Sequence, residues 1–600
     1  MEQVPKVVGA DIEPANSIHP TGDADEEAQS RWNTCDTGPR ATMLLLDETR
    51  FWHAPRTWLS GAYARPYETS VNRYGVPLSG CAGGYGDGYG DGYGYGYNSH
   101  LGMHDFLRCW GPIVNYDDLG HAEAACSEAR SAFDHVRCIH AVYNEWEYLR
   151  NAANAKVPGE EIFVTINTTD GRFEESHGAH FNLCGARELY DRVFKPGRLW
   201  MCQRHVSPEC TFLATCTVAA AVVFGQGHVL RLPDGRACYV LSQRAHHTGC
   251  LLHSATTIAF QRAVLNTRDE AHADRSLARY HFTLFDPNLA QASLLCRTWF
   301  MQAVVAAMEA GYLDPGLIVL DPVEAFRYWS CGFSPSAGGV ITEYATVDGR
   351  MVSPVDVLES VTNDLEAMYR AGLIPEAIVP DTGRILPVMR RLLAELREGD
   401  LYKLARHFDW ALRWQLLAGQ MDAEGWPLES DEIALTNQLY SHVDKEIGLF
   451  WPFQDNGFAE RMVDDAEVRR MQDYGPDDTR AYTRNRILEK FGGDVRSCDW
   501  SRMTLEIPSR RSRYLGRRVT LRLDVPWRYG KAETGAIIEG ARTAEGLCRA
   551  LAAAGLCVDA EDLETPRGAE PGAGVTALPR LDTQDIPTGW WMPAGEAVDA

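Results

Sequence analysis

The 600-residue sequence contains 16 cysteines but no Cys-x-x-Cys pair. Structural zinc sites usually show such a pair, so the sequence does not indicate structural zinc. The cysteines are scattered and do not form the dense pattern of a small disulfide-bonded secreted domain. We therefore expect buried free thiols in a cytoplasmic protein.

Long apolar runs are also absent. No stretch reaches the about 18 apolar residues that a membrane-spanning helix needs, so no membrane partner is expected. The most apolar stretch, residues 211–225, is too short to cross a bilayer and predicts a buried helix. The first residues, MEQVPKVVGADIEPANSIHP, do not combine a basic start with an apolar block, so they do not predict a signal peptide.

Basic residues are scarce. The chain has 58 Lys and Arg against 82 Asp and Glu, a net charge of −24. Neutralising the phosphates of a nucleic acid requires clustered Lys and Arg, so this balance argues against a nucleic-acid partner. The hydrophobic content of 45% is normal for a globular protein. At this length we expect one large domain with smaller parts.

Regular periodicity is weak between residues 14 and 105. A Gly-Tyr repeat within this stretch, GGYGDGYGDGYGYGYN at residues 83–98, predicts a mobile spacer loop. So much glycine cannot bury enough surface to offset the entropy lost on ordering. From residue 561 onward the chain is rich in Pro, Gly, Ala and acidic residues, which predicts a disordered tail.

Strand and helix patterns alternate along the rest of the chain. Alternating, β-branched segments predict strands at residues 6–13, 160–169, 237–245, 280–286, 498–507 and 517–525. Helical patterns occur at residues 295–311 and almost continuously at 353–450, including 400–421. This arrangement predicts an α+β fold in which an antiparallel sheet has helices on one side.

Four short segments concentrate carboxylates, imidazoles and arginines. In GADIE and in ARYHF, the pairs Asp11/Glu13 and Arg279/His281 each share one strand face, because side chains alternate with period two. The other segments are NYDDLGHAEAACSE and NTTDGRFEESHGAHFN. Each segment alone fits a turn or a solvated charged surface, and NTRDEAHADRSLARYH alone fits a charged helix. Together, hard oxygen ligands with a few imidazoles and nearby arginines indicate a Mg²⁺-nucleotide enzyme.

Longer motifs follow one another in a recognisable order. They are LSQRA (241–245), SATT (254–257), NTRDEAHAD (266–274), DPN (286–288), DDTRAY (477–482) and CDW (498–500). In these motifs the sequence resembles the family of the Pup ligase and the depupylase/deamidase, relatives of glutamine synthetase. The resemblance covers residues 7–525.

The resemblance implies a glutamine-synthetase-like fold with a concave antiparallel sheet backed by helices, and ATP and Mg²⁺ in the cradle. It implies a catalytic domain over residues 1–475 with a long insertion at 14–110, and a small C-terminal domain at 476–560 before the tail at 561–600. In this family, the ligase attaches the modifier Pup to lysine through a γ-glutamyl phosphate. The depupylase hydrolyses the same kind of side-chain amide with nucleotide bound.

The resemblance also implies roles for individual residues. The implied Mg²⁺ ligands are Asp11, Tyr116, Glu123, His180 and His281. Arg279 is implied to contact the nucleotide phosphates and Trp500 to pack against the nucleotide.

The catalytic carboxylate depends on which spacing applies. The depupylase spacing makes it Asp118, whereas the ligase spacing chooses Asp117. Arg244 and Arg268 are expected to hold the carboxylates of a C-terminal glutamate, since arginine binds carboxylates in a bidentate manner. The alternative for Arg268 is a salt bridge with a neighbouring acid, Asp269 or Glu270.

Several positions depart from the family pattern. Val114 stands where an ATP-contacting arginine is expected, Phe181 replaces an acid, and Ala122 replaces a proline. Three functions therefore stay open: a depupylase/deamidase-like amidase, which the spacing favours, a ligase, and a nucleotide-binding regulatory protein without catalysis. A Pup-like modifier or its conjugates is the expected partner.

Overall fold

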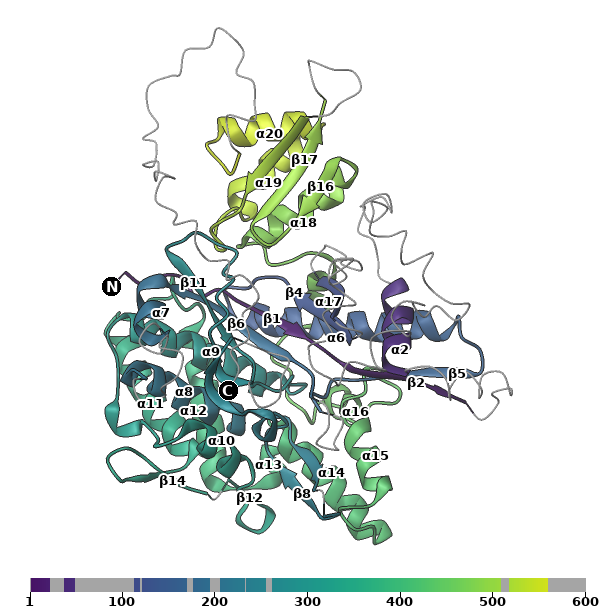
Figure 1. Ribbon diagram of the computed structural model, residues 1–600, viewed down its shortest axis with the longest axis vertical. Helices are drawn as coiled ribbons and strands as arrows, with labels where there is room; N and C mark the ends of the chain where they lie inside the picture. Colours follow the sequence, from purple (N-terminus) through teal and green to yellow (C-terminus); the bar gives the residue numbers. More distant parts are fainter. Residues whose placement is uncertain are drawn as a thin grey trace, which may run out of the picture.

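The computed structural model describes residues 2–21, 37–48, 113–118, 121–169, 176–194, 206–232, 234–254, 262–340, 342–508 and 517–558. The predicted Gly-Tyr spacer and the predicted disordered tail lie outside these residues and stay predictions. Figure 1 shows a large body, in which a sheet packs on helices, and a small domain above it. Among the described helices, none combines the length and the apolarity that crossing a bilayer requires.

The main sheet has seven strands in the spatial order β3-β4-β1-β6-β11-β10-β9. The strands are β1 (Val8–Ile12), β3 (Ile113–Asp118), β4 (His121–Cys126), β6 (Ala179–Ala186), β9 (Cys250–His253), β10 (Ala263–Asn266) and β11 (Leu277–Phe282). The predicted α+β class is confirmed. One described pair departs from the all-antiparallel sheet that was predicted: β9 and β10 run parallel.

The two faces of the sheet differ in character. Along β6, Phe181 and Leu183 are buried, whereas His180 and Asn182 are half-buried. The Phe181 ring packs edge-on against His135 at a centroid distance of 5.6 Å, and His135 belongs to helix α6 (Ala132–Asn154). The face of Phe181 therefore packs on the helices, and the face of His180 and Asn182 is left for other contacts.

The helices behind the sheet are strongly apolar. Helix α8 (Pro208–Val223) corresponds to the apolar run at residues 211–225, and every residue from Phe212 to Val223 is buried. Helix α9 (Gln291–Glu309) is buried along its whole length. Helices that are hydrophobic on all sides belong to a core and not to a surface, so the predicted buried helix is confirmed. Figure 1 shows α6, α8 and α9 layered on one side of the sheet.

Shorter elements surround this core. Residues in the stretch of weak periodicity form β2 (Ala15–Pro20), which pairs with β5 (Glu160–Thr165), and α2 (Thr37–Asp47). The remaining peripheral elements are α7 (Arg187–Phe194), α10 (Pro322–Ser330), α16 (Trp451–Asp455) and α17 (Asp465–Asp473), and the short strands β7 (His228–Arg231), β8 (Ala237–Val240), β12 (Phe333–Ser334), β13 (Gly339–Val340), β14 (Tyr344–Ala345) and β15 (Met351–Val352).

The helical stretch predicted at residues 353–450 is confirmed. It contains α11 (Pro354–Arg370), α12 (Thr382–Glu398), α13 (Leu401–Leu404), α14 (Asp409–Glu424) and α15 (Asp431–Leu439). The segment 400–421 is not one helix. Asp400 caps α13 by accepting bonds from the backbone N–H groups of Tyr402 and Lys403. The chain leaves helical geometry at Phe408, directly before α14 begins at Asp409.

The small domain has its own hydrophobic core. Its elements are α18 (Arg480–Phe491), β16 (Val495–Cys498), β17 (Arg502–Ile507), β18 (Arg517–Arg522), α19 (Lys531–Gly540) and α20 (Ala544–Ala553). Its core residues include Met503, Leu505, Val519 and Leu521, and they form a cluster separate from the main core. The strand predicted at residues 498–507 is interrupted because Asp499 accepts bonds from the backbone N–H groups of Ser501 and Arg502, which closes a turn.

A buried ionic contact joins the two domains. Glu128, which follows β4, accepts a bond of 2.7 Å from Arg480 and another of 2.7 Å from Arg484, both on α18. Burial alone would raise the pKa of Glu128, but Arg484 and then Arg480 outweigh it and lower the pKa to about 2. The hydroxyl of Thr479 donates to the Glu128 carbonyl at 3.0 Å. We call Glu128, Thr479, Arg480 and Arg484 the domain clamp; it gives the DDTRAY motif a structural role.

Candidate active site

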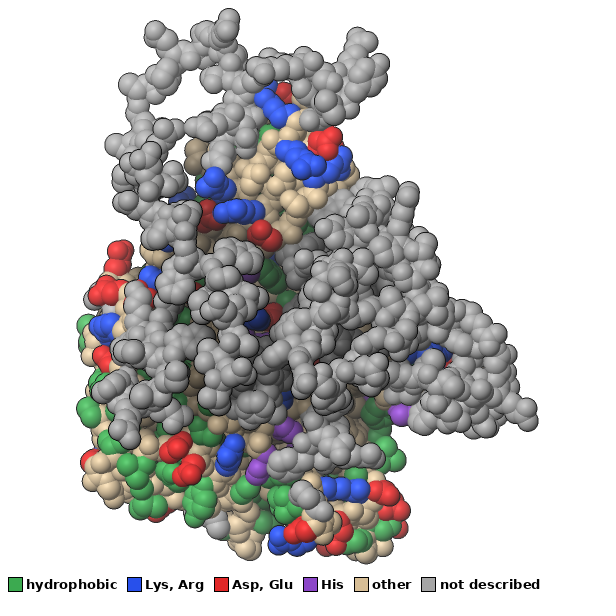
Figure 2. Space-filling model, viewed as in Figure 1, with side chains coloured by type: hydrophobic (Ala, Val, Ile, Leu, Met, Phe, Trp, Pro, Cys, Tyr) green, Lys and Arg blue, Asp and Glu red, His purple; other side chains and the backbone are tan. Residues whose placement is uncertain are grey.

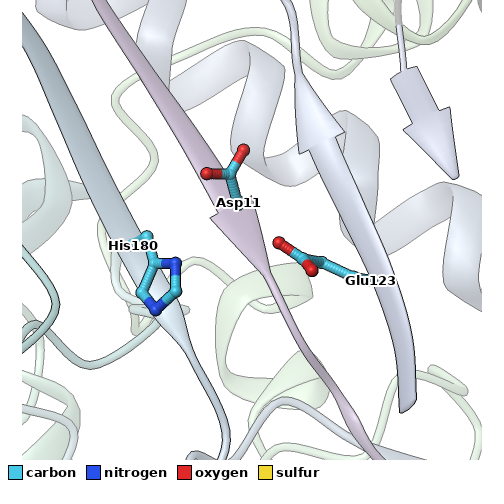
Figure 3. Close-up of side chains that lie close together, drawn as sticks. All are labelled: Asp11, Glu123 and His180. Carbon is cyan, nitrogen blue, oxygen red and sulfur yellow. The ribbon is translucent and has the colours of Figure 1, made fainter. Parts of the chain in front are cut away.

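Three side chains from three neighbouring strands converge on the sheet face that carries His180 and Asn182. Asp11 comes from β1, Glu123 from β4 and His180 from β6, and one ligand atom of each lies within 4.8 Å of the others. The register explains this, because Asp11 is paired with His180 on one side and with Ala125, two residues from Glu123, on the other. Figure 3 shows the three side chains projecting into the same space.

The donor set fits a hard divalent cation. Two carboxylates and one imidazole supply mainly oxygen ligands, which Mg²⁺ and Mn²⁺ prefer over sulfur. Ligand atoms on one Mg²⁺ ion lie at most about 4.2 Å apart, which is twice the bond length of about 2.1 Å. The ligand atoms here lie within 4.8 Å of one another, so small side-chain rotations would bring them onto one ion.

His281 lies beside this cluster. Its ring is edge-on to the His180 ring at a centroid distance of 4.9 Å, and it is buried. Within the described structure neither of its ring nitrogens has a hydrogen-bond partner. Burial, followed by nearby arginines, holds the pKa of both histidines well below the usual range. Both rings are therefore neutral and keep a nitrogen lone pair, as a metal ligand must.

Asn182 links the cluster to Arg279. Its side-chain amide donates to Asp11 Oδ2 at 3.0 Å, and its carbonyl oxygen accepts from Arg279 Nε at 2.7 Å. Arg279 Nη2 lies 3.9 Å from Asp11 Oδ2. Sequence reasoning did not select Asn182, although its position two residues after His180 places both on one strand face.

Glu13 is a second carboxylate that sequence reasoning left without a role. It lies just after β1, and its Oε2 accepts a 2.6 Å bond from the backbone N–H of Gly178. A Cβ atom at Gly178 would lie 2.6 Å from Glu13 Oε1 and 2.8 Å from His180 Nε2. Glycine is therefore required here by the close approach of two site side chains.

We expect Gly178→Ala to weaken binding of Mn²⁺, used as a paramagnetic divalent cation, by about tenfold, because the added methyl group displaces His180. Electron paramagnetic resonance would measure the free ion, and circular dichroism would show that the variant stays folded. Gly419→Ala is the matched control, since a Cβ there has no neighbouring atom within 4 Å. An unchanged Mn²⁺ affinity in folded Gly178→Ala would contradict the assigned site.

The two arginines expected to bind substrate differ in environment. Arg244 is buried, and its guanidinium donates to the Thr283 carbonyl at 3.1 and 2.9 Å and to the Ser176 hydroxyl and the His177 carbonyl. These protein acceptors engage all three of its nitrogens. Arg268 is half exposed and lies 3.6 Å from Glu270. Of the two, Arg268 has the side chain that a ligand can reach.

The backbone places the predicted catalytic segment next to Glu123. In β3, Tyr116 pairs with Glu123 and Asp118 pairs with His121. Directly paired residues share a sheet face, so positions 116 and 118 fall on the face of Glu123 and position 117 falls on the opposite face. The side chains at these three positions lie outside the described part of the structure.

Trp500 lies farther away, in the turn between β16 and β17 of the small domain. Its ring lies 5.0 Å from the Arg484 guanidinium. A polar cavity of about 430 Å³ separates the residues around this turn from the loop at 269–277.

Glu270 and His272 in the loop at 269–277 have positive φ angles of 29° and 45°. A residue other than glycine with positive φ is strained and persists only when surrounding contacts hold it. Arg480 of the domain clamp provides one such contact, because it donates to the His272 carbonyl at 2.6 Å.

The sequence of this chain is similar to those of known proteins. The family model described as Pup-ligase protein matches residues 113–504. A depupylase from Acidothermus cellulolyticus is 30% identical over 73% of this chain and 81% of its own length. A Pup–protein ligase from Pseudarthrobacter chlorophenolicus is 26% identical over 65% of this chain and 82% of its own.

Solved structures agree in fold. The ligase PafA in complex with the prokaryotic ubiquitin-like protein Pup superposes with a TM-score of 0.63 at 18% identity, covering 89% of this chain and 92% of PafA. PafA in complex with ADP gives a TM-score of 0.59 at 21% identity, covering 72% and 88%. The chain belongs to the Pup-ligase protein family, as its motifs predicted.

Proposed function

We propose that this protein is an ATP- and Mg²⁺-dependent hydrolase of the Pup-ligase family that cleaves a glutamyl side-chain amide or isopeptide bond. The observation that carries the proposal is the convergence of Asp11, Glu123 and His180 on one sheet face, with Arg279 tied to it through Asn182. Two carboxylates and neutral imidazoles suit Mg²⁺, and a guanidinium suits the phosphates of a nucleotide bound with it.

The nucleotide part of the proposal draws on the relatives and on this chain's own residues. A solved relative carries ADP, and here Arg279 and Trp500 are the proposed nucleotide contacts. Asp11, Tyr116, Glu123, His180 and His281 would hold the metal. When bound, Mg²⁺ would supply positive charge that offsets negative charge developing on the substrate.

The chemical step is assigned to Asp118. Its register position, two residues after Tyr116 and on the face of Glu123, suits a carboxylate that acts on the amide as a nucleophile or activates water. Arg268, whose side chain is half exposed, is the better placed arginine for a substrate carboxylate. Arg244 then fixes the backbone segment around Ser176 and His177.

The proposed partner is Pup or a Pup-like modifier, free or conjugated to a protein. PafA has been solved in complex with Pup, and this chain shares its fold. We also propose a cytoplasmic location, since the described cysteines, most of them buried, are free thiols.

A ligase is the second candidate. The matching family model and the Pseudarthrobacter relative both carry the ligase name, and the same metal and nucleotide groups serve either reaction. The third reading, a protein without catalysis, is weakened by the fold. Phe181, which replaces an acid, faces α6 on the helix side of the sheet, so this change removes nothing from the metal face.

Incubation with ATP, Mg²⁺ and a Pup-conjugated protein, with product release and ADP followed together, tests the proposal. A hydrolase releases Pup without forming one ADP per bond cleaved. A ligase forms conjugates from free Pup with one ADP per bond, and this outcome would replace the first proposal by the second. Nucleotide binding with neither activity on either substrate would leave the regulatory reading.

A further inference from the structure

A row of apolar side chains is exposed on the large body, outside the proposed catalytic site. Among the described residues, eight large hydrophobic side chains are exposed, and three of these, Leu320, Val347 and Met351, are 61%, 53% and 53% exposed and lie together. Single hydrophobic residues are normal on a protein surface, whereas a group of them marks a contact site. Figure 2 shows hydrophobic side chains gathered where Figure 1 draws β14.

Backbone pairing brings these side chains together. The N–H of Leu320 donates to the Ala345 carbonyl at 3.0 Å, and Ala345 in β14 pairs with Met351 in β15. Side chains at paired positions lie next to each other on one face, so Leu320, Ala345 and Met351 form a row across three short strands. Val347 follows two residues after Ala345, in the turn that joins β14 to β15. We call these four residues the apolar row.

The other side of the same strands is packed against the core. Val319 and Thr346, which lie opposite each other in an isolated bridge, are both buried, and so is Val352. The N–H of Val319 also donates to the hydroxyl of Thr215 on α8 at 3.3 Å. The strands are therefore fixed from the inner side, and the apolar row is the surface that this packing leaves outward.

Acidic residues border the apolar row. In the segments 318–321 and 343–352 the sequence has three acids, Asp321, Glu343 and Asp348, and one basic residue, Arg350. All three acids are exposed. Arg350 donates to Asp348 at 3.0 Å and to the Gly316 carbonyl. The surface thus combines an apolar centre with a rim of net negative charge.

We propose that the apolar row binds a segment of a partner protein that carries apolar side chains flanked by Lys or Arg. The acidic rim is complementary to such flanks. A second copy of this chain fits less well, because a two-fold contact would bring the same acids against one another. An anionic lipid surface would be repelled by the same rim and by the net charge of −24. The inference is independent of the proposed function, because none of these residues belongs to the catalytic site.

Fluorescence anisotropy of a labelled peptide of leucine and lysine tests the inference on the full-length protein. We expect the double variant Leu320→Ser/Met351→Ser to bind this peptide about tenfold more weakly than the wild type, because it removes two apolar contacts. A peptide of leucine and glutamate of the same length should bind the wild type at least about tenfold more weakly than the lysine peptide. Circular dichroism would show that the variant stays folded, as expected for two exposed positions.

The matched control is Leu373→Ser/Leu435→Ser, which makes the same kind of change at two leucines that are 51% and 55% exposed. Leu373 follows α11, whose 17 residues span about 25 Å and separate it from Met351, and Leu435 lies on α15. This control should bind the lysine peptide as the wild type does. Equal weakening in both double variants, or a wild type that binds neither peptide, would overturn the inference. So would dimerisation in sedimentation equilibrium that Leu320→Ser/Met351→Ser abolishes, since it would assign the apolar row to a second copy.

Discussion

Replacing Asp118 by Asn is expected to lower turnover of a Pup-conjugated substrate by more than about 100-fold, the usual contribution of a positioned acid–base or nucleophilic group. Asparagine keeps the size of the side chain but can neither attack the amide nor accept a proton at neutral pH. Nucleotide affinity, measured by isothermal titration calorimetry, should stay within a factor of about three of the wild type, because the proposed metal ligands are unchanged.

Asp117→Asn is the matched control, since it makes the same chemical change one residue away. Strand alternation puts position 117 on the face opposite Glu123, so we expect turnover to fall by less than about threefold. If instead Asp117→Asn is inactive and Asp118→Asn is mild, the ligase spacing applies. If both variants keep full activity, the carboxylate mechanism does not operate in this protein.

The second large effect concerns stability. Glu128→Gln should lower the free energy of unfolding by about 3 kcal/mol or more, because it leaves the buried Arg480 and Arg484 without a counter-charge. Glu539→Gln removes a carboxylate from an exposed pair with Arg486 and should cost less than about 1 kcal/mol. Urea unfolding followed by circular dichroism measures both. Equal losses in the two variants would mean that the domain clamp adds no more than a surface ion pair.

Low pH should weaken the contact of Glu128 with Arg480 and Arg484. The ordinary pKa of Glu128 is 4.5 and the folded protein holds it at about 2. A depressed folded pKa means that the unfolded chain takes up the proton first, so this carboxylate's contribution is complete above pH 4.5 and is lost as pH falls toward 2. Between those values the wild type should lose stability more steeply than Glu128→Gln. If the free energy of unfolding falls with pH equally in the wild type and in Glu128→Gln, the depressed pKa of Glu128 does not stabilise the protein.

Strand alternation predicted that Asp11 shares a face with Glu13 and Arg279 with His281, whereas the set of metal ligands came from the family resemblance. Each of these pairs is two residues apart on one strand, so its side chains point to the same side of the sheet. The structure brings the ligand atoms of Asp11, Glu123 and His180 within 4.8 Å of one another. The helix over the apolar run at 211–225 could be predicted because its composition permits no exposed face. Such local patterns depend on near neighbours in the sequence, which a single chain displays.

Other features depend on partners far away in the sequence. Arg244 lies in a motif that suggests ligand binding, but its acceptors are carbonyl and hydroxyl groups at positions 176, 177 and 283, which no local pattern reveals. Asn182 gains its role from Asp11 and Arg279, which lie 171 and 97 residues away. The parallel pairing of β9 with β10 likewise does not follow from the composition of either strand.

The domain clamp has a consequence for folding during synthesis on the ribosome. Glu128 leaves the ribosome 356 residues before Arg484, its partner. At about 5 to 20 residues per second, this interval lasts roughly 20 to 70 seconds. Lys6, which precedes β1, waits nearly as long for its partner Glu309, 303 residues later. The nascent chain therefore carries the Glu128 carboxylate without its two arginine partners for more than half of its synthesis, and translation itself sets the earliest moment at which the two domains can be joined.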